Sequence, residues 1–232
     1  MKAYAIVIKD NSTSVNGFNK LFQSSIEVGN DFVIERYDAV TPNQVITRTI
    51  DLDVRWNYPW NRQERDIATG LIKTPYPTAN PNARIACALS HYELWLKCYN
   101  ENETFLIMEH DAVWKKKLAN WVTEDNTYDI IGINDPRGAT RKSAMYHEIL
   151  QKRESLIQKP PVLDDTPYIP HGIAGNSAYV MKPSGAKKML DLVAEFGLWP
   201  NDAIMCRQLV RTLGTTKTYF TGVQGLPSTT SQ

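Results

Sequence analysis

The sequence predicts an α/β fold with one central sheet that is mixed but mostly parallel. The first observation is a series of apolar runs of strand length, at 3–8, 32–37, 105–108 and 128–133. The second is that segments with helical periodicity separate these runs, most clearly at 15–26 and 82–99. Alternating strands and helices are typical of sheets that helices cover on both faces.

Length and composition indicate an ordinary globular chain. The 232 residues can bury a core without disulfides or structural metals, so we expect a single domain over 1–232. The apolar fraction is 42%, the charged fraction is 22% and the formal net charge is +1. Because basic runs with interleaved aromatics are missing from the sequence, a nucleic-acid partner is not predicted.

Three segments lack clear periodicity. We expect irregular excursions over about 41–82 and 136–168, with short helices near 62–68 and 144–158, and a loosely held tail over about 222–232. Between the last two segments the pattern predicts a strand at 177–181, a helix from Pro183 to Gly197, a helix at 203–213 and a strand at 218–220. Irregular segments of this length are usually functional or mobile.

The targeting features predict a cytoplasmic protein. The first apolar run is too short for a signal peptide, and no window approaches the ~20 apolar residues of a membrane span. Cys87, Cys98 and Cys206 are an odd number without framework spacing, so we interpret them as reduced thiols.

An acidic segment follows the most apolar strand of the chain. The run 105–108 is followed by Glu109, His110 and Asp111. Successive strand residues point to opposite sides, so Glu109 and Asp111 face the same way and His110 faces the other. Ligands of open α/β sheets bind beyond the carboxyl ends of strands. The pair could therefore hold a hard divalent cation, although a solvated acidic corner is the alternative.

The order of the motifs resembles glycosyltransferase family twenty-five, the relatives of lipopolysaccharide and collagen galactosyltransferases. A helix of small residues carrying Ser90 and His91 is followed by the strand that ends at Glu109, His110 and Asp111. Segment 34–40 resembles the family's second strand, 128–131 the strand after the acidic triplet and 175–180 a later strand-helix unit, all in the family's order. The resemblance implies a single Rossmann-like domain of the A-type glycosyltransferase fold. It further implies a nucleotide-sugar donor and a divalent metal.

Carried onto this sequence, the resemblance implies that Asp111 ligates Mn²⁺ or Mg²⁺, and that Glu109 reaches the metal or the donor ribose. Carboxylate and water ligands suit these ions. His110 departs from the acidic residue usual at that position, and is either held by local packing or contacts the donor. The first loop, with Lys9 and Asp10, lacks the family's arginine-rich run but belongs to the expected donor site.

Further donor contacts are expected from two places. Ser90 and His91 lie in mid-helix, where neighbouring side chains diverge by about 100°. His91 either binds a donor phosphate, orients the metal loop or packs in the core, and Ser90 lacks the partner base of a nucleophile. His171, Gly172 and Gly175 are expected to line the donor pocket, because glycine lets the backbone approach a sugar closely.

An inverting transfer needs a base that accepts the proton of the acceptor hydroxyl. Asp202, at the start of a predicted helix, is our first candidate, although a carboxylate is favoured there by the helix dipole alone. Asp135, at the end of another strand, is the second candidate.

Two functions follow. The first is a metal-dependent transferase that moves a hexose, with galactose or glucose favoured, from a UDP-sugar to a glycan, lipid-linked or protein acceptor. The second is an inactive nucleotide-sugar or glycan-binding module on the same fold. A two-metal phosphohydrolase needs clustered histidines, which four scattered ones do not supply.

Overall fold

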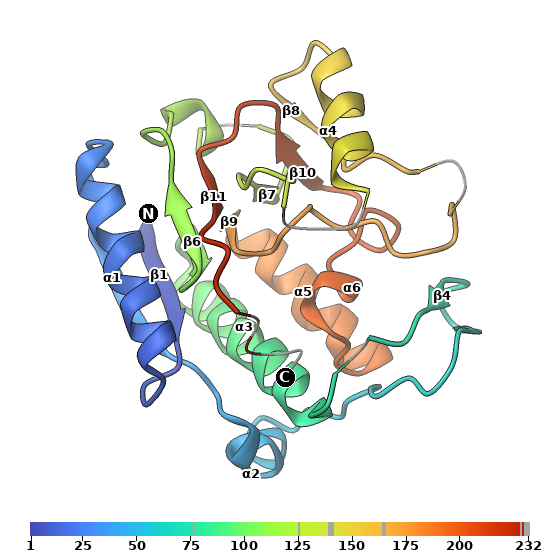
Figure 1. Cartoon of the computed structure of the whole chain (residues 1–232). Coiled ribbons are helices and arrows are strands. Elements are labelled where there is room, and N and C mark those ends of the chain that lie inside the picture. The colour runs from blue at the N-terminus through green and yellow to red at the C-terminus, as the bar shows by residue number, and fades with distance from the viewer. Residues whose placement is uncertain (77, 125, 139–141, 164–165, 228, 230–232) are drawn as a thin grey trace.

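The computed structural model describes residues 1–76, 78–124, 126–138, 142–163, 166–227 and 229. Its main feature is a seven-stranded sheet in the order β2-β1-β5-β9-β7-β10-β8 (Figure 1). The strands are β1 (Lys2–Val7), β2 (Ile34–Asp38), β5 (Phe105–Glu109), β7 (Ile130–Gly132), β8 (Ile157–Gln158), β9 (Ala178–Met181) and β10 (Leu213–Thr216). Two small sheets pair β3 (Glu64–Arg65) with β4 (Ile72–Lys73), and β6 (Ala112–Trp114) with β11 (Thr221–Val223).

The predicted α/β fold with a mixed, mostly parallel sheet is confirmed. β1 pairs in parallel with β2 and β5, and β7 pairs in parallel with β10. β9 runs antiparallel between β5 and β7, and β8 runs antiparallel to β10. Five of the seven strands therefore share one direction, which brings the carboxyl ends of β1, β2 and β5 to one edge.

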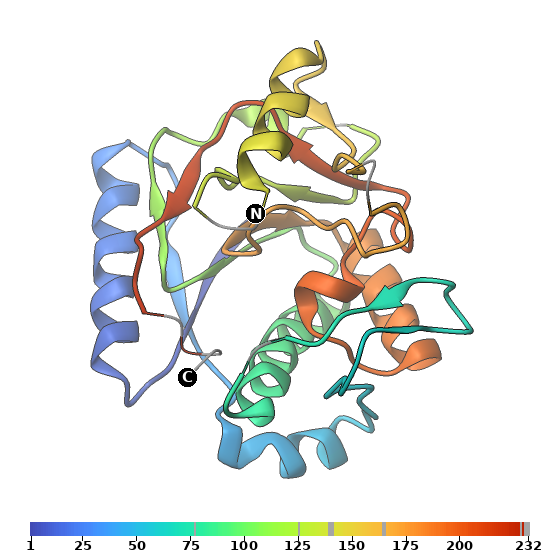
Figure 2. The same cartoon turned by 45° about the vertical axis from the view of Figure 1, so that its right-hand side comes forward.

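Helices cover both faces of the sheet, because its strands are apolar on both faces. The side chains of Ala5 and Met108 pack with Leu21 of α1 (Ser12–Glu27). Those of Ile6 and Ile107 pack toward α3 (Pro81–Glu101) and α5 (Pro183–Phe196). Figure 2 shows α1 on one side of the sheet and α3 with α5 on the other. Successive residues of one strand thus fill two different cores.

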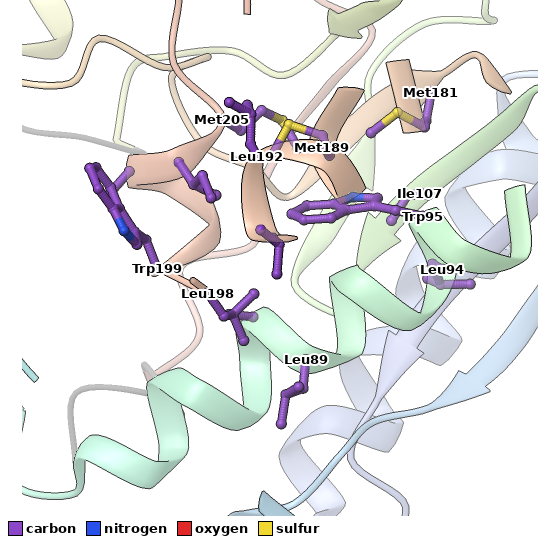
Figure 3. Close-up of a cluster of buried hydrophobic side chains, with 14 of the residues drawn as sticks. Leu89, Leu94, Trp95, Ile107, Met181, Met189, Leu192, Leu198, Trp199 and Met205 are labelled. Carbon is purple, nitrogen blue, oxygen red and sulfur yellow. The ribbon is translucent and has the colours of Figure 1, made fainter. Parts of the chain in front are cut away.

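The larger core lies between α3 and α5. The Trp95 ring of α3 lies next to Met189 and Leu192 of α5 (Figure 3), and Leu89 and Leu94 of α3 belong to the same buried cluster. All five side chains are at most 3% exposed. The helix that carries Ser90 and His91 is therefore fixed along much of its length by close packing, which sets the positions of both side chains.

The first excursion is more ordered than expected. It contains a 3-10 turn (Pro42–Gln44), α2 (Val45–Asp51) and the β3–β4 hairpin. The helix predicted near 62–68 is wrong, because that stretch forms β3 and a turn. Lys73 is buried where it pairs with Asp66 at 2.8 Å and lies over the ring of Trp199 at 5.4 Å. These contacts tie the excursion to the segment before Asp202.

The later part of the chain differs in detail. A 3-10 turn (Asn120–Val122) precedes β7, and α4 (Ser143–Lys152) lies inside the predicted helical range 144–158 apart from its first residue, before the chain turns into β8. The predicted helix at 203–213 is wrong: α6 covers only Asn201–Ile204, and β10 begins at Leu213. Residues 205–212 form turns instead, because Cys206 bridges Gly172 and the Arg207 N–H donates to the His171 carbonyl at 2.9 Å.

The predicted loose tail is wrong for its first residues. β11 covers Thr221–Val223, later than the strand expected at 218–220, and pairs with β6. The Gln224 backbone N–H donates to the Asp111 carbonyl at 2.8 Å, and its side-chain amide lies 2.8–3.2 Å from the carbonyls of Gly17, His110 and Ala112. The rest of that prediction falls partly on 228 and 230–232, which lie outside the described residues.

Within the described ranges, no helix is both long and apolar enough to cross a bilayer. The three cysteines are free thiols, with Cys98 and Cys206 buried and Cys87 partly exposed.

Candidate active site

A pocket of about 890 Å³ opens at the carboxyl ends of β1, β2 and β5. The first half of α3, the loop before β9 and α6 form its other walls. Most of the predicted site residues line this one pocket: Ser90, His91, Glu109, His110, Asp111, His171, Gly172, Gly175 and Asp202. Residues from 90 to 202 in the sequence are thus brought together at the sheet edge.

The carboxylates of Glu109 and Asp111 interact in this pocket. One oxygen of Asp111, Oδ1, is buried and has no hydrogen-bond partner among the described residues. Burial and the negative charge of Glu109 raise the pKa of Asp111 to about 7, against a smaller opposing effect of the Ser177 hydrogen bond. A buried carboxylate oxygen without a partner costs stability. Oxygen donors in this environment fit Mn²⁺ or Mg²⁺, because the cation would supply the missing partner and offset the repulsion.

Glu109 is held by a chain of hydrogen bonds from the core. His91 lies with Nε2 3.1 Å from Glu109 Oε1 and Nδ1 2.8 Å from the Tyr179 hydroxyl, which also accepts from Trp95 Nε1 at 2.9 Å. Burial opposes ionisation of Glu109, but its hydrogen bond and charge interaction with His91 outweigh that effect and lower its pKa. An ionised Glu109 only accepts, so His91 donates to it from Nε2.

Of the roles open to His91, this chain supports that of orienting the acidic segment. His91 is fully buried, and both ring nitrogens face protein groups. Ser90 lines the pocket, but its hydroxyl donates to the Ala86 carbonyl and accepts from the Val40 N–H, both at 2.9 Å. Ser90 thus joins α3 to the end of β2.

His110 points away from the carboxylate pair, as strand alternation predicts. Its backbone N–H donates to the Ile6 carbonyl at 3.2 Å. Its ring lies against Gly17 of α1, where an added Cβ would be 3.3 Å from His110 Cδ2. Burial lowers the pKa of His110 despite the opposing charge of Glu109. The side chain reaches the pocket wall while packing on α1, so local packing accounts for its position.

Gly17→Ala is expected to lower the activity of this site. The new Cβ would lie 2.8 Å from the His110 carbonyl oxygen and 2.9 Å from Leu226 Cδ1, so either α1 or the acidic segment must move. Relative to glycine, alanine stabilises a helix interior by about 1 kcal/mol, which offsets part of the stability lost to the clash. It does not prevent the displacement of the segment that carries Asp111. Measured melting temperature and kcat would separate the two effects. Unchanged kcat would contradict this prediction.

The carboxylate of Asp202 is open to the pocket at the start of α6. The Tyr76 hydroxyl donates to Oδ1 at 3.1 Å. Desolvation raises the pKa of Asp202, and the positive charge of Arg84 and the Tyr76 hydrogen bond partly oppose this rise. A raised pKa makes the carboxylate a stronger base than an ordinary surface aspartate.

The loop before β9 packs directly on α6. A Cβ on Gly172 would lie 2.8 Å from the Met205 carbonyl oxygen and 3.0 Å from that of Asp202, so glycine allows this contact. Gly175 has φ +75°, a left-handed conformation that favours glycine. His171 is buried with Nε2 2.8 Å from the Thr166 carbonyl oxygen. These three residues shape the wall between Asp202 and Asp111.

Three predicted residues lie outside the pocket lining. Lys9 and Asp10 are exposed in the turn between β1 and α1. Asp135 is buried beyond β7, where Lys115 and Arg137 donate to Oδ2 at 3.0 and 2.9 Å. Burial opposes ionisation, but these hydrogen bonds hold the pKa of Asp135 well below its usual range. Asp135, the second candidate base, is therefore already engaged in ion pairs with Lys115 and Arg137.

Tyr76, Arg84, Cys87 and Asn176 are among the polar lining residues that sequence reasoning missed. Arg84 lies over the Tyr76 ring at 4.4 Å and acts on Asp202 through its charge. Asn176 is 6% exposed, and both polar atoms of its amide lack a hydrogen-bond partner among the described residues. Its position next to Gly175 in a glycine-bearing loop was the available signal.

A family model and several solved structures match most of this chain. The family model described as "Glycosyltransferase family 25 (LPS biosynthesis protein)" matches residues 19–205. No curated protein matches the sequence. Among solved structures, an active-site mutant of LgtC has a TM-score of 0.48 at 8% identity, covering 98% of this chain and 88% of that one.

Two further structures are similar over most of this chain. The galactosyltransferase LgtC in complex with donor and acceptor sugar analogs has a TM-score of 0.46 at 8% identity, with 98% of this chain and 88% of that chain covered. The bifunctional glycosyltransferase WbbM has a TM-score of 0.43 at 11% identity, with 95% of this chain and 38% of that chain covered.

Proposed function

This chain belongs to glycosyltransferase family 25, and from that premise we propose that it transfers a hexose, galactose or glucose, from a UDP-sugar to an acceptor hydroxyl. The acceptor is a glycan or a lipid-linked or protein-linked group. The reaction depends on a divalent cation and inverts the anomeric centre. The observation that carries this proposal is the unpartnered Oδ1 of Asp111 beside Glu109 in the pocket.

Asp111 and Glu109 are the residues that would hold Mn²⁺ or Mg²⁺. When bound, the cation supplies Lewis-acid stabilisation of the charge that the departing nucleoside diphosphate gains. His91 fixes the Glu109 carboxylate through its Nε2 hydrogen bond at 3.1 Å, and Tyr179 fixes His91 in turn. The protein therefore holds the acidic pair in place before the donor arrives, which reduces the reorganisation needed during the reaction.

Asp202 is the base in this proposal. It lines the same pocket as Asp111, at the wall that α6 forms. The proton of the acceptor hydroxyl passes to the Asp202 carboxylate as the hydroxyl oxygen attacks the anomeric carbon and the bond to the diphosphate breaks. Tyr76 orients the carboxylate through its hydrogen bond to Oδ1. A direct attack of this kind inverts the configuration at that carbon.

Asn176 contacts the donor sugar in this proposal, because its amide offers both a donor and an acceptor to hydroxyl groups. Asn176→Ala is expected to lower kcat/KM by about 10- to 100-fold, the scale of one or two hydrogen bonds. Its melting temperature should stay the same or rise, since the native amide is buried without partners.

Asn134→Ala is the matched control for this prediction. Asn134 is also buried, but it accepts from the Thr221 hydroxyl at 3.1 Å. The control should therefore lose stability and keep its KM for the donor. An Asn176→Ala protein with wild-type kcat/KM would exclude the donor contact.

The direct test is an assay of UDP-galactose, UDP-glucose and other nucleotide sugars with Mn²⁺ or Mg²⁺, over a panel of glycan and lipid-linked acceptors. We expect cation-dependent transfer from a UDP-hexose, and NMR of the product should show an inverted anomeric configuration. Retention would remove Asp202 from the role of base. Donor binding by calorimetry without turnover on any acceptor would favour the binding-module alternative.

A further inference from the structure

Cys87 is a pocket residue that the proposed reaction does not use. It lies four positions before His91 on α3, so both side chains project from the same face of the helix. The Cys87 thiol, a His91 ring nitrogen and a Glu109 carboxylate oxygen lie within 4.8 Å of one another. Cys87 is partly exposed and lines the pocket, so an ion can reach it from solvent.

These three atoms are a different kind of ligand set from the carboxylate pair. Sulfur and imidazole ligands favour Zn²⁺, whereas carboxylate and water suit Mn²⁺ and Mg²⁺. One distance already suits a shared ion: His91 Nε2 and Glu109 Oε1 are 3.1 Å apart, a separation compatible with two ligands each about 2.0–2.2 Å from zinc. The Cys87 thiol is 3.8 Å from Asn201 Oδ1, a weak contact that it can give up.

We propose that Cys87, His91 and Glu109 form a zinc site that overlaps the proposed Mn²⁺ or Mg²⁺ site through Glu109. Binding releases the thiol proton to solvent, and the Cys87 thiolate and the Glu109 carboxylate together neutralise the two charges of Zn²⁺. His91 then binds through Nε2 and donates from Nδ1 to the Tyr179 oxygen. The fourth position opens to the pocket, as in sites with three protein ligands.

The groups behind His91 support this role. Metal-binding histidines commonly hydrogen-bond to a protein group through the other ring nitrogen, which fixes the ring orientation. Tyr179 lies 2.8 Å from Nδ1 and is itself held by Trp95 Nε1 at 2.9 Å, and all three side chains are fully buried. The imidazole is thus already fixed with Nε2 toward Glu109.

If the chain has the proposed function, zinc bound at this site should inhibit the transfer reaction. Zinc bound to Glu109 removes one ligand of the proposed catalytic cation and places a second positive ion beside Asp111. Zn²⁺ should therefore inhibit transfer at concentrations well below those of Mn²⁺ in the assay, and excess Mn²⁺ should relieve the inhibition incompletely.

The test titrates the full chain with Zn²⁺ alone, in competition with a chromophoric chelator. We expect one site per chain in the wild type and an affinity at least ~100-fold lower in Cys87→Ser, since loss of an outer-shell partner alone costs 10- to 100-fold. Cys98→Ser is the matched control, because Cys98 lies on the same helix and donates to the Glu103 carbonyl at 3.1 Å, as a serine can. The control should bind zinc like the wild type.

Co²⁺ provides a spectroscopic signature. A thiolate ligand gives a charge-transfer band in the near ultraviolet, which should be present in the wild type and Cys98→Ser and absent in Cys87→Ser. Equal zinc affinity in wild type and Cys87→Ser, or a cobalt spectrum without that band in wild type, would overturn the site.

Activity separates this proposal from the proposed function. Cys87→Ser should retain Mn²⁺-dependent transfer and resist zinc. Tight zinc binding in a chain that transfers no sugar would leave the zinc site standing and reject the transferase proposal. Efficient Mn²⁺-dependent transfer with wild-type zinc sensitivity in Cys87→Ser would reject the zinc site alone.

Discussion

Asp111→Asn is expected to lower kcat by about 10²–10³-fold, the scale seen when one group that stabilises transition-state charge is removed. The amide keeps the size of the side chain and can still bond to Ser177, but it lacks the negative charge that a cation needs. Initial rates across a Mn²⁺ titration would measure the effect. The remaining activity should require more Mn²⁺ for half-saturation.

Asp31→Asn is the matched control for this substitution. Asp31 also carries a carboxylate, but it pairs with Lys117 at 2.7 Å on the surface with a side chain that is 84% exposed. The control should keep wild-type rates and Mn²⁺ dependence. Wild-type rates in Asp111→Asn at limiting Mn²⁺ would move the cation to other residues.

Asp202→Asn is expected to lower kcat by about 10²–10⁴-fold, the usual contribution of a positioned base. The substitution preserves the contact with Tyr76 while removing the ability to accept a proton. KM for the donor should change little, because the group acts on the acceptor. Steady-state kinetics with both substrates varied would separate these effects.

Asp135→Asn distinguishes the two candidate bases. Asp135 is buried between Lys115 and Arg137, so loss of its charge leaves both cations without their partner. We expect a lower melting temperature with kcat close to wild type. The reverse result, in which Asp135→Asn loses kcat and Asp202→Asn does not, would assign the base to Asp135.

The pH profile gives a second measure of Asp202. Only the ionised carboxylate accepts a proton, so kcat falls as pH drops through its pKa. Because desolvation raises that pKa, the acidic limb should lie at higher pH than for an ordinary aspartate. The limb should disappear in Asp202→Asn, and an identical limb in both proteins would assign it to another group.

Much of the sheet could be predicted because its strands can be recognised from their own residues, without knowledge of their partners. The apolar run of β5 and the change to Glu109 and Asp111 at its end are visible in the sequence, and so are the small residues of α3. The helix expected at 203–213 was wrong because backbone contacts of Cys206 and Arg207 with residues 171–172 hold this stretch in turns. Short segments of this kind are decided by partners distant in the sequence.

The same distinction applies to the site. Strand periodicity predicted that the His110 side chain points away from the carboxylate pair. This orientation could be predicted because the alternation of side chains along a strand depends on local geometry alone. Tyr76 could not be assigned to the pocket, because the first excursion is folded back by the contacts of Lys73 with Asp66 and Trp199. The unpartnered state of Asn176 is equally invisible in a sequence, because it depends on what all its neighbours fail to supply.

The bonds of Gln224 have a consequence for how the site is assembled during folding. Its amide joins the carbonyls of Gly17 and His110, and the first of these contacts spans 207 positions in the sequence. Contacts between such distant segments form late, because closing a long loop costs chain entropy before it gains any stabilisation. The Asp111 turn is therefore restrained only once the segment that carries Gln224 has docked against α1 and the end of β5. Only the fully folded protein should then bind the cation tightly. Collapsed forms with native secondary structure should bind it weakly.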